Sequence, residues 1–409
     1  MTDAATILHP LPDERAIDRP ARDAVRDHFD RIAERRPRFR KRNRYYYQQT
    51  LRFLRGMIPP GSRVLEVGCA DGHILAALEP SEGVGIDISP RMVAAARAAA
   101  AERGDTHLSF HEADIESVTF DRTFDYIVLS DTLSNLLDIQ RALDNLRSAC
   151  TSETRIIIHY HNVLWEPMLR FGEAVGLKLP QPRNNWLSFS DMRHFFTLAD
   201  FELVKFERRI LMPKYIPLLS AAANRYLAPL PLVNHLCLTN IFIARMLPKQ
   251  DQKPLSTTIL IPCRNEKGNI QPAIDRLPDF GAAQEIIFVD GHSTDGTPEE
   301  IRRVIAAHPG KDIKLFTQPG RGKGDAVRHG LAHATGDVLM ILDADLTVPP
   351  EDLPKFHHAI ASGKGEFING TRLVYPMEDQ AMRFLNILGN KFFSVVLSWL
   401  VGQPLKDTL

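Results

Sequence analysis

The sequence contains few cysteines and no long uninterrupted apolar segment. Its four cysteines are far apart and form neither a CxxC pair nor a cluster with histidine: Cys69, Cys150, Cys237 and Cys263. This spacing indicates neither a disulfide framework nor a zinc site, so we expect a reducing, cytoplasmic environment. The first residues lack the basic and then apolar pattern of a signal peptide. The stretch that comes nearest to a membrane-spanning helix, residues 384–402, is interrupted by Lys391.

Net charge is also lacking, because 50 lysines and arginines balance 50 aspartates and glutamates. The balance gives no indication of a polyanionic partner. The exception is residues 31–44, where many arginines and lysines are opposed only by Glu34. Such a run is typical of a solvated helix face, but it also occurs in segments that bind nucleic acid or anionic lipid, and the sequence leaves these alternatives open.

The length and the pattern of apolar residues predict two α/β domains. A single hydrophobic core rarely serves more than about 250–300 residues, and this chain has 409. Strand-like and helix-like segments alternate over residues 21–247 and again over residues 257–409, on either side of a polar linker at 248–256. Such alternation is typical of parallel sheets with right-handed crossovers. Residues 1–20 are polar and contain proline, so we expect them to be disordered.

The first series carries the clearer secondary-structure pattern. Strands are expected at residues 63–67, 83–88, 124–129, 155–160, 202–210 and 239–246, and helices at 21–55, 74–78, 90–102, 137–149 and 191–198. A proline-rich apolar insert, residues 214–236, precedes the last strand. We interpret it as a lid or a wall beside an acceptor, with a packed excursion that contacts no substrate as the alternative.

A glycine-containing turn follows the first strand and comprises Glu66, Gly68, Ala70 and Gly72. Glycines at a strand-to-helix turn let the backbone approach a ligand closely, and nucleotide-like ligands bind at the carboxyl edge of a parallel sheet. The spacing is GxAxG preceded by an acid, which differs from the GxGxxG of a dinucleotide-binding turn.

Two further acids follow the next two strands. Asp87 ends the second strand, where a carboxylate can accept hydrogen bonds from both hydroxyls of a ribose. Asp114 follows the third strand and could receive the exocyclic amine of an adenine. One such acid is usually a solvated loop residue, but acids at three successive strand ends predict a nucleoside-binding pocket.

With these motifs, residues 60–160 resemble the Rossmann-like class I methyltransferases, whose cofactor is S-adenosylmethionine. The resemblance implies that Gly68 and Gly72 border the methionine part of the cofactor, with Glu66 near its amino group. It also implies that the last two strands complete the sheet and that the seventh is antiparallel. The family more often has glycine where Ala70 stands. The full set of expected cofactor-binding residues is Glu66, Gly68, Ala70, Gly72, Asp87 with Ile88 at the ribose, Asp114 with Ile115 at the adenine, and Ser130.

The methyl acceptor is expected beside the ends of the fourth and fifth strands. Ser130 and Asp131 follow the fourth strand, and His159 and His161 lie around the end of the fifth. A histidine there, with His159 as our candidate, could take the proton of a hydroxyl acceptor; the alternative is a structural histidine bonded to the backbone. The tetrapeptide after the fourth strand is SDTL instead of an NPPY-like motif, so base amines of nucleic acid are an unlikely acceptor. An RNA methyltransferase that uses residues 31–44 remains an alternative hypothesis.

The second series places acids and cations after its own strands. Pro262, Arg264 and Glu266 lie at the end of the first strand and just after it, and Asp290 ends the next. A third apolar run ends at Asp343-Ala344-Asp345, where two carboxylates could share Mg²⁺ or Mn²⁺. Upstream, the turn Arg321-Gly322-Lys323-Gly324 could place cations against a diphosphate that the metal also neutralises.

These motifs resemble the family 2 inverting glycosyltransferases of the GT-A fold, and within them the branch that transfers sugars to dolichyl or polyprenyl phosphates. The resemblance implies a nucleotide-sugar donor and a lipid-phosphate acceptor, which as an anion needs no strong base. Asp343 and Asp345 would bind the metal, Asp345 and Arg372 would act at the reaction centre, and Arg372 would contact a phosphate. The expected nucleotide-sugar residues are Pro262, Arg264, Glu266, Asp290, Arg321, Lys323, Asp343, Ala344 and Asp345.

The end of the chain resembles the membrane-proximal part of that branch. Residues 381–402 have apolar side chains at helical spacing, which predicts a helix in the membrane interface, or alternatively a helix in the core or in a subunit contact. The family usually continues beyond the point where this chain stops, so we expect an incomplete glycosyltransferase half. The leading hypothesis is a bifunctional transferase of glycan or glycolipid assembly, cytoplasmic or at the inner face of the membrane. The alternative is an active methyltransferase with a second domain that only binds a nucleotide or anchors the protein.

Overall fold

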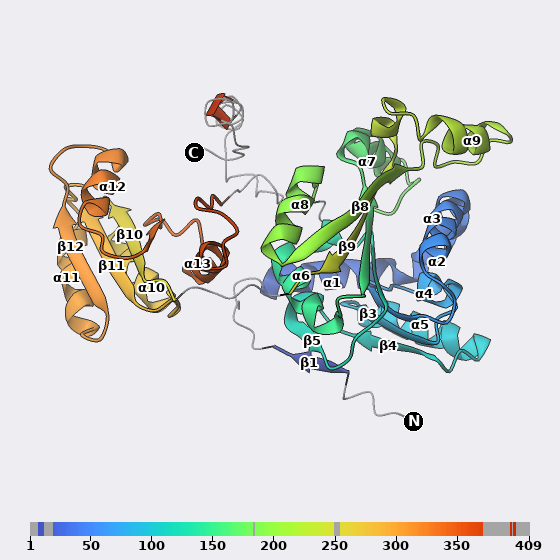
Figure 1. The fold of residues 1–409 in the computed structure, drawn as a ribbon, viewed down its shortest axis with the longest axis horizontal. Coiled ribbons are helices and arrows are strands. Elements are labelled where there is room, and N and C mark those ends of the chain that lie inside the picture. The colour runs from blue at the N-terminus through green and yellow to red at the C-terminus, as the bar shows by residue number, and fades with distance from the viewer. Residues whose placement is uncertain are drawn as a thin grey trace. The chain divides into compact units, whose positions relative to one another are not determined.

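The computed structural model describes residues 7–11, 19–182, 185–248, 254–370, 393–394 and 396–397. The chain divides into two compact units, one containing the residues up to Pro248 and the other Lys249–Asn369 (Figure 1). Both are α/β units with Rossmann-like sheets, as the sequence predicts. No helix in these described ranges is both long enough and apolar enough to cross a bilayer.

The first unit is built on a seven-stranded sheet with the order β4-β3-β2-β6-β7-β9-β8. Its strands are β2 (Arg63–Val67), β3 (Glu82–Asp87), β4 (Leu108–Glu112), β6 (Tyr126–Ser130), β7 (Arg155–His161), β8 (Phe201–Arg209) and β9 (Thr239–Met246). The first five pair in parallel, whereas β9 pairs antiparallel with both β7 and β8. The predicted strand positions and the antiparallel seventh strand are therefore confirmed.

Alternating residues of these strands fill two separate cores, one on each face of the sheet. Leu65 and Ile158 belong to one apolar cluster, whereas Val64 and Ile157 belong to the other. A parallel sheet buried on both faces needs such nearly continuous apolar strands. The carboxyl edge of the sheet is then the place where polar side chains can gather.

Helices surround the sheet of the first unit. They include α4 (His73–Ala77), α5 (Pro90–Arg103), α6 (Ile139–Leu146), α7 (Glu166–Ala174) and α8 (Phe189–Leu198). The insert at 214–236 forms short turns, α9 (Leu219–Ala222), η8 (Ala223–Leu227) and η9 (Val233–Leu236).

The single helix predicted over residues 21–55 is divided into several parts. The parts are α1 (Arg19–Ile32), η3 (Ala33–Arg35), α2 (Arg36–Arg42) and α3 (Arg44–Met57). Pro37 lies in the first turn of α2, where it lacks the N–H that would continue the preceding helix. A second interruption lies at Asn43, whose backbone is not helical and which separates α2 from α3.

The disorder expected for residues 1–20 does not hold for residues 7–11. The strand β1 (Leu8–Pro10) pairs antiparallel with β5 (Val118–Phe120). Ile7 is only 8% exposed and packs in the main core of the unit. Burial of this side chain and the strand pairing together offset the entropy cost of ordering the segment.

The second unit contains a four-stranded parallel sheet in the order β12-β11-β10-β13. Its strands are β10 (Thr257–Cys263), β11 (Gln284–Asp290), β12 (Asp312–Thr317) and β13 (Val338–Ile341), with helices α10 (Lys267–Asp275), α11 (Thr297–Ala307), α12 (Lys323–Leu331) and α13 (Leu353–Ala361). Strand β12 was not predicted, because Asp312 and Lys314 interrupt its apolar pattern.

Candidate active sites

A cavity of about 550 Å³ lies at the carboxyl edge of the first sheet. Its volume is within the range of small-molecule and cofactor pockets. Most of the expected cofactor residues line it: Gly68, Ala70, Asp87, Ile88, Asp114, Ile115 and Ser130. The cavity thus joins the turn after β2 to the ends of β3 and β6.

The turn at Gly68 requires glycine for both backbone and spatial reasons. Gly68 has φ +74°, and a Cβ there would lie 2.4 Å from Oγ1 of Thr132. Thr132 cannot move away freely, because its hydroxyl donates to the carbonyl of Val67 at 2.8 Å. Ala70 also has a positive φ, of 48°, which explains why glycine suits this position well.

Asp87 faces this turn. Its Oδ2 accepts from the Ala70 N–H and its Oδ1 from the Ser89 N–H, both at 2.9 Å. Burial raises the pKa of this carboxyl above its usual range, and the two backbone donors oppose that shift. Each carboxylate oxygen has a second lone pair, so Asp87 can still accept from a ribose.

Asp114 also lines the cavity, and it lies close to a cation that the sequence did not predict. Its Oδ1 accepts from the Glu116 N–H at 2.9 Å, and Arg22 Nε lies 3.5 Å from its Oδ2. Glu116 also lines the cavity, and burial raises its pKa to about 8. Arg22 comes from α1, far away in sequence, and no local pattern indicated it.

Glu66 and Gly72 do not line the cavity, unlike the other expected residues. Glu66 points into the unit, where its Oε2 accepts from the Leu75 N–H at 3.1 Å. Burial raises the pKa of Glu66 well above its usual range. The geometry therefore does not support a role for this side chain beside the cofactor's amino group.

The basic run at residues 31–44 contributes directly to the cavity. Arg36 and Phe39 line it, and Arg40 forms an ion pair with Asp71, in the glycine turn. His73 Nδ1 lies 3.0 Å from the other oxygen of Asp71. Part of the basic run therefore makes contacts within the first unit instead of facing solvent.

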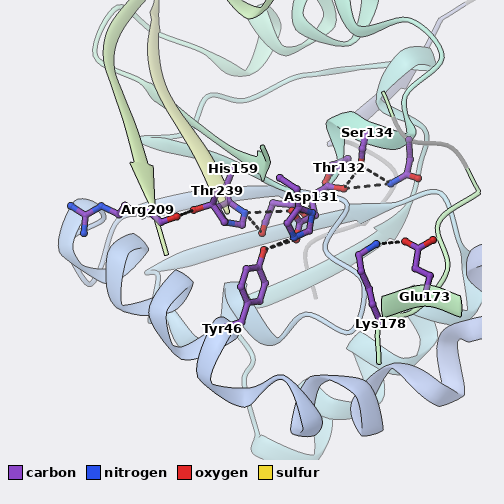
Figure 2. Close-up of polar contacts among 12 residues, drawn as sticks. Tyr46, Asp131, Thr132, Ser134, His159, Glu173, Lys178, Arg209 and Thr239 are labelled. Atoms are coloured by element: carbon purple, nitrogen blue, oxygen red, sulfur yellow. Dashed lines mark hydrogen bonds and ion pairs between the residues drawn. The ribbon is translucent and has the colours of Figure 1, made fainter. Parts of the chain in front are cut away.

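A polar cluster forms the other end of the cavity, where the acceptor was expected. Tyr46 from α3 points toward Asp131 and His159 (Figure 2). Its hydroxyl lies 3.2 Å from Asp131 Oδ2 and 3.2 Å from His161 Nε2. Nδ1 of His161 lies 3.6 Å from Asp131 Oδ1. Tyr46, Asp131 and His161 line the cavity, and sequence reasoning missed Tyr46.

His159 is in a different position from His161. Its side chain is 2% exposed and is not among the residues that line the cavity. It contacts Ser130 Oγ at 3.5 Å and lies 3.7 Å from Asp131. The geometry therefore favours His161 over the predicted His159 as the proton acceptor.

Burial sets the charge states of this cluster. Burial lowers the pKa of His161 to about 4, so the imidazole is neutral at physiological pH. Burial alone would raise the pKa of Asp131, but His161 and His159 outweigh it and hold that pKa below its usual range. Burial raises the pKa of Tyr46 well above 10, so its hydroxyl keeps its proton.

The carboxyl edge of the second sheet gathers the other predicted set. Asp290 lies in register with Cys263 of β10, and both of its carboxylate oxygens lie 3.3 Å from the Ser293 N–H. Pro262 is in β10 itself, and Arg264 and Glu266 follow it. Strand β13, which precedes Asp343, pairs with β10 on its other side, so these residues share one edge.

The turn with Arg321 and Lys323 meets the Asp343-Ala344-Asp345 motif. Lys323 Nζ lies 2.6 Å from Asp343 Oδ1, and Asp345 Oδ1 accepts from the N–H and the hydroxyl of Thr347, both at 3.0 Å. Arg321 is exposed in the same turn. Arg372 and most of residues 381–402 lie outside the described residues.

The donor atoms at this edge suit a hard divalent cation. In the described part of the chain, no group of three or more His, Cys, Asp or Glu side chains could hold a metal by itself. Two carboxylates with a diphosphate and water would supply the oxygen ligands that Mg²⁺ or Mn²⁺ prefers. The residues present therefore fit a metal that is bound together with its substrate.

Family models match both units. The model for a methyltransferase domain matches residues 39–205, and the model for glycosyl transferase family 2 matches residues 258–399. The chain joins a methyltransferase domain to a family 2 glycosyltransferase domain. It is therefore a protein of the transferase class.

Curated relatives match the glycosyltransferase domain. A dolichol-phosphate mannosyltransferase of Saccharomyces cerevisiae is 36% identical over 109 residues, which are 25% of this chain and 40% of that enzyme. An undecaprenyl-phosphate 4-deoxy-4-formamido-L-arabinose transferase of Aeromonas hydrophila is 30% identical over 110 residues, 26% of this chain and 34% of that enzyme. The chain thus spans less than half the length of these relatives.

Solved structures resemble the methyltransferase domain at lower identity. Magnesium protoporphyrin IX methyltransferase from Synechocystis PCC 6803 with bound SAH is 18% identical, with a TM-score of 0.42 over 56% of this chain and 100% of that one. The putative methyltransferase complexed with the Haloferax volcanii Trm112 activator is 20% identical, with a TM-score of 0.43 over 56% of this chain and 99% of that one.

Substitution of Gly72 tests the packing behind the methyltransferase pocket. A Cβ there would lie 2.6 Å from Phe110, and the backbone has φ +70°. We expect Gly72→Ala to destabilise the domain by about 2–4 kcal/mol, from backbone strain plus overpacking. Gly104→Ala is the matched control, because Gly104 has φ +75° but nothing within 4 Å of its Cβ position. Urea unfolding checks both variants, and equal destabilisation would contradict the overpacking.

Proposed function

We propose that the chain is a bifunctional transferase that uses S-adenosylmethionine in its first domain and a nucleotide-sugar in its second. The observation that carries the first activity is one cavity that joins the Gly68 turn, Asp87 and Asp114 to the Asp131–His161 cluster. A donor pocket and an acceptor site are thereby continuous, which methyl transfer requires because the nucleophile must approach in line.

In the first domain, we assign the cofactor to residues on the turn side of the cavity. Asp87 would accept from the ribose hydroxyls, and Asp114 with Ile115 would lie beside the adenine. Bound S-adenosylmethionine supplies an electrophilic methyl group on a sulfonium. Ala70 and Gly68 leave backbone exposed to the methionine part.

The acceptor side suits a hydroxyl group. Asp131 beside Nδ1 of His161 favours the tautomer with its proton on Nδ1, so Nε2 can take the acceptor's proton directly or through the Tyr46 hydroxyl. The imidazole is neutral throughout the physiological range, so its Nε2 lone pair can accept a proton, and Asp131 would stabilise the imidazolium that forms. Within the basic run, Arg36 faces the cavity and Arg40 pairs with Asp71. Fewer cations of the run are therefore available to bind RNA.

In the second domain, we propose transfer of a sugar from a nucleotide-sugar to a polyprenyl or dolichyl phosphate. The names of the curated relatives support this acceptor class. Asp343 and Asp345 would hold Mg²⁺ or Mn²⁺ with the donor diphosphate, while Lys323 and Arg321 would balance charge as the nucleoside diphosphate leaves. Arg372 keeps its predicted role at a phosphate as part of this proposal. Contact with the membrane surface follows from the acceptor.

Asp87→Ala tests the first assignment. Loss of the carboxylate removes the predicted ribose contacts and the bond to Ala70, so we expect S-adenosylmethionine affinity to fall about 100-fold or more in calorimetric titration. The matched control is Glu112→Ala, since Glu112 pairs in register with Asp87 but is exposed and does not line the cavity. Unchanged affinity in a folded Asp87→Ala protein would refute the assignment.

A further inference from the structure

One end of the methyltransferase domain exposes an unusually apolar surface. It consists of η7 (Val163–Trp165), the outward side of α7 and the insert at 214–236. Figure 1 shows α7 and α9 of the insert at the same end of the unit. Large apolar side chains protrude there, including Leu164, Met168, Phe171, Leu218, Tyr226 and Leu232. Leu218 and Leu232 are each 88% exposed. We call this surface the apolar rim.

Specific contacts hold the two parts of the apolar rim together. Trp165 Nε1 donates to the Leu236 carbonyl at 2.8 Å, and Asn162 Nδ2 donates to the His235 carbonyl at 3.0 Å. The rings of Tyr45 and Tyr215 pack with centroids 5.6 Å apart. The exposed side chains thus belong to a fixed surface, and contiguous patches of this kind mark interaction sites.

The basic helix α2 adjoins the apolar rim. Arg42 donates to the Gly176 carbonyl at 3.0 Å, just after α7, and Lys214 donates to Asn43 at 2.6 Å, at the start of the insert. Arg36 and Phe39 face the cavity. Most of the exposed residues of and next to α2 are cationic, with Glu34 as the one exposed acid: Arg35, Arg38, Lys41, Arg42 and Arg44.

The rim itself carries no unbalanced acid. Residues 213–236 contain Lys214 and Arg225 and no aspartate or glutamate. On and next to α7, Glu166 pairs with Arg170 and Glu173 pairs with Lys178. Apolar side chains beside a cationic helix complement an anionic lipid surface. The apolar side chains enter the membrane interface, and the cationic side chains contact the anionic headgroups.

The cavity opens at this rim. Met168 and Phe171 both line the cavity and are 61% and 62% exposed, respectively, and Lys214 and Pro213 at the start of the insert also line it. We propose that the apolar rim and α2 rest on an anionic bilayer, so that an amphiphilic methyl acceptor reaches the His161 end of the cavity from the lipid. The route of the acceptor rests on the proposed methyltransferase function, whereas the surface contact does not. S-adenosylmethionine titration of the same samples tests that function separately.

A fluorophore placed on the rim tests the contact directly in the full chain. All four native cysteines are buried, so a label on Leu218→Cys reports from this surface. We expect its NBD emission to shift to the blue and to intensify with vesicles of phosphatidylglycerol and phosphatidylcholine, and to change less with phosphatidylcholine alone. Val204→Cys is the matched control, an exposed apolar position on β8 outside the rim, and its label should not respond.

An unresponsive Leu218 label would overturn the proposal, even if the protein sediments with vesicles through another segment. A label that responds to RNA and not to vesicles would also overturn it.

Neutralising cationic side chains on α2 tests the electrostatic part of the contact. Replacing Arg38 and Lys41 with glutamine should weaken vesicle binding of the rim label roughly 5-fold per charge, and added salt should reduce the difference. The matched control replaces exposed Arg91 and Arg193, on α5 and α8, and should leave the binding curve unchanged. Equal binding by the α2 variant and the parent would contradict the electrostatic part of the contact.

Discussion

Replacing His161 with glutamine is expected to lower the rate of methyl transfer by about 10²–10⁴-fold, the usual contribution of a general base. Glutamine can still bond to the Tyr46 hydroxyl, which now lies 3.2 Å from Nε2, but it cannot take a proton. Affinity for S-adenosylmethionine should remain, because the expected donor contacts lie at Asp87 and Asp114. The measurement is transfer of tritiated methyl groups to a lipid extract, beside calorimetric titration of the cofactor.

The His161→Gln variant is also expected to change the pH dependence of stability, which can be measured without a methyl acceptor. The pKa of His161 is about 4 in the folded protein and about 6.5 in an unfolded chain. Below pH 6.5 the unfolded state gains a proton that the folded state does not, so stability that is present above pH 6.5 is lost as the pH falls toward 4. We expect the parent to lose about 2 kcal/mol between pH 6.5 and 5 that His161→Gln does not lose.

His159→Gln separates the two histidines. His159 is buried behind Ser130 and Asp131 and does not line the cavity, so its replacement should affect the melting temperature more than the rate of methyl transfer. A folded His159→Gln protein that binds the cofactor but transfers methyl groups as slowly as His161→Gln would contradict the assignment to His161.

The largest effect in the second domain is expected from Asp345→Asn. Removing one of two carboxylates that would hold the cation should weaken Mn²⁺-dependent binding of GDP or UDP by about 100-fold or more, because a metal bridge contributes several kcal/mol. Calorimetric titration with and without EDTA checks this, and the two nucleotides also identify the preferred base.

Asp279→Asn is the matched control for that variant. Asp279 is 89% exposed, pairs with Lys311, and precedes β11 at the opposite edge of the sheet. Its replacement should leave the nucleotide affinity unchanged. Equal affinity of the parent in Mn²⁺ and in EDTA would refute a metal at Asp343 and Asp345.

Local patterns predicted the sheets and the acids at their edges. A buried parallel strand is a short apolar run, and the residue after it falls at the carboxyl edge, so Asp87 and Asp290 could be placed from sequence. The position of the Glu66 side chain was predicted less well. The alternation of side chains along β2 turns it toward the Leu75 N–H and not into the cavity.

The contributions of the N-terminal helices could not be predicted from sequence. Arg22, Arg36 and Tyr46 reach the cavity only because α1, α2 and α3, respectively, pack around it. Ile32 and Phe39 lie in the same apolar cluster as Ala70 of the glycine turn. Long-range packing of this kind has no local signature. The assignment to His161 over His159 depends on how far each lies along β7. His161 is the last residue of the strand and therefore lies nearer to the carboxyl edge of the sheet than His159 does.

Residues of α1 form part of the cavity wall, which affects how the methyltransferase domain can be isolated. The methyltransferase match spans residues 39–205, whereas Arg22 and Arg36 precede it and the antiparallel strand β9 (Thr239–Met246) follows it. A fragment cut at those limits would remove Arg22 and Arg36 from the cavity wall and expose the edge of β7, which favours aggregation. Expression limits should therefore begin before Arg19 and extend beyond Met246.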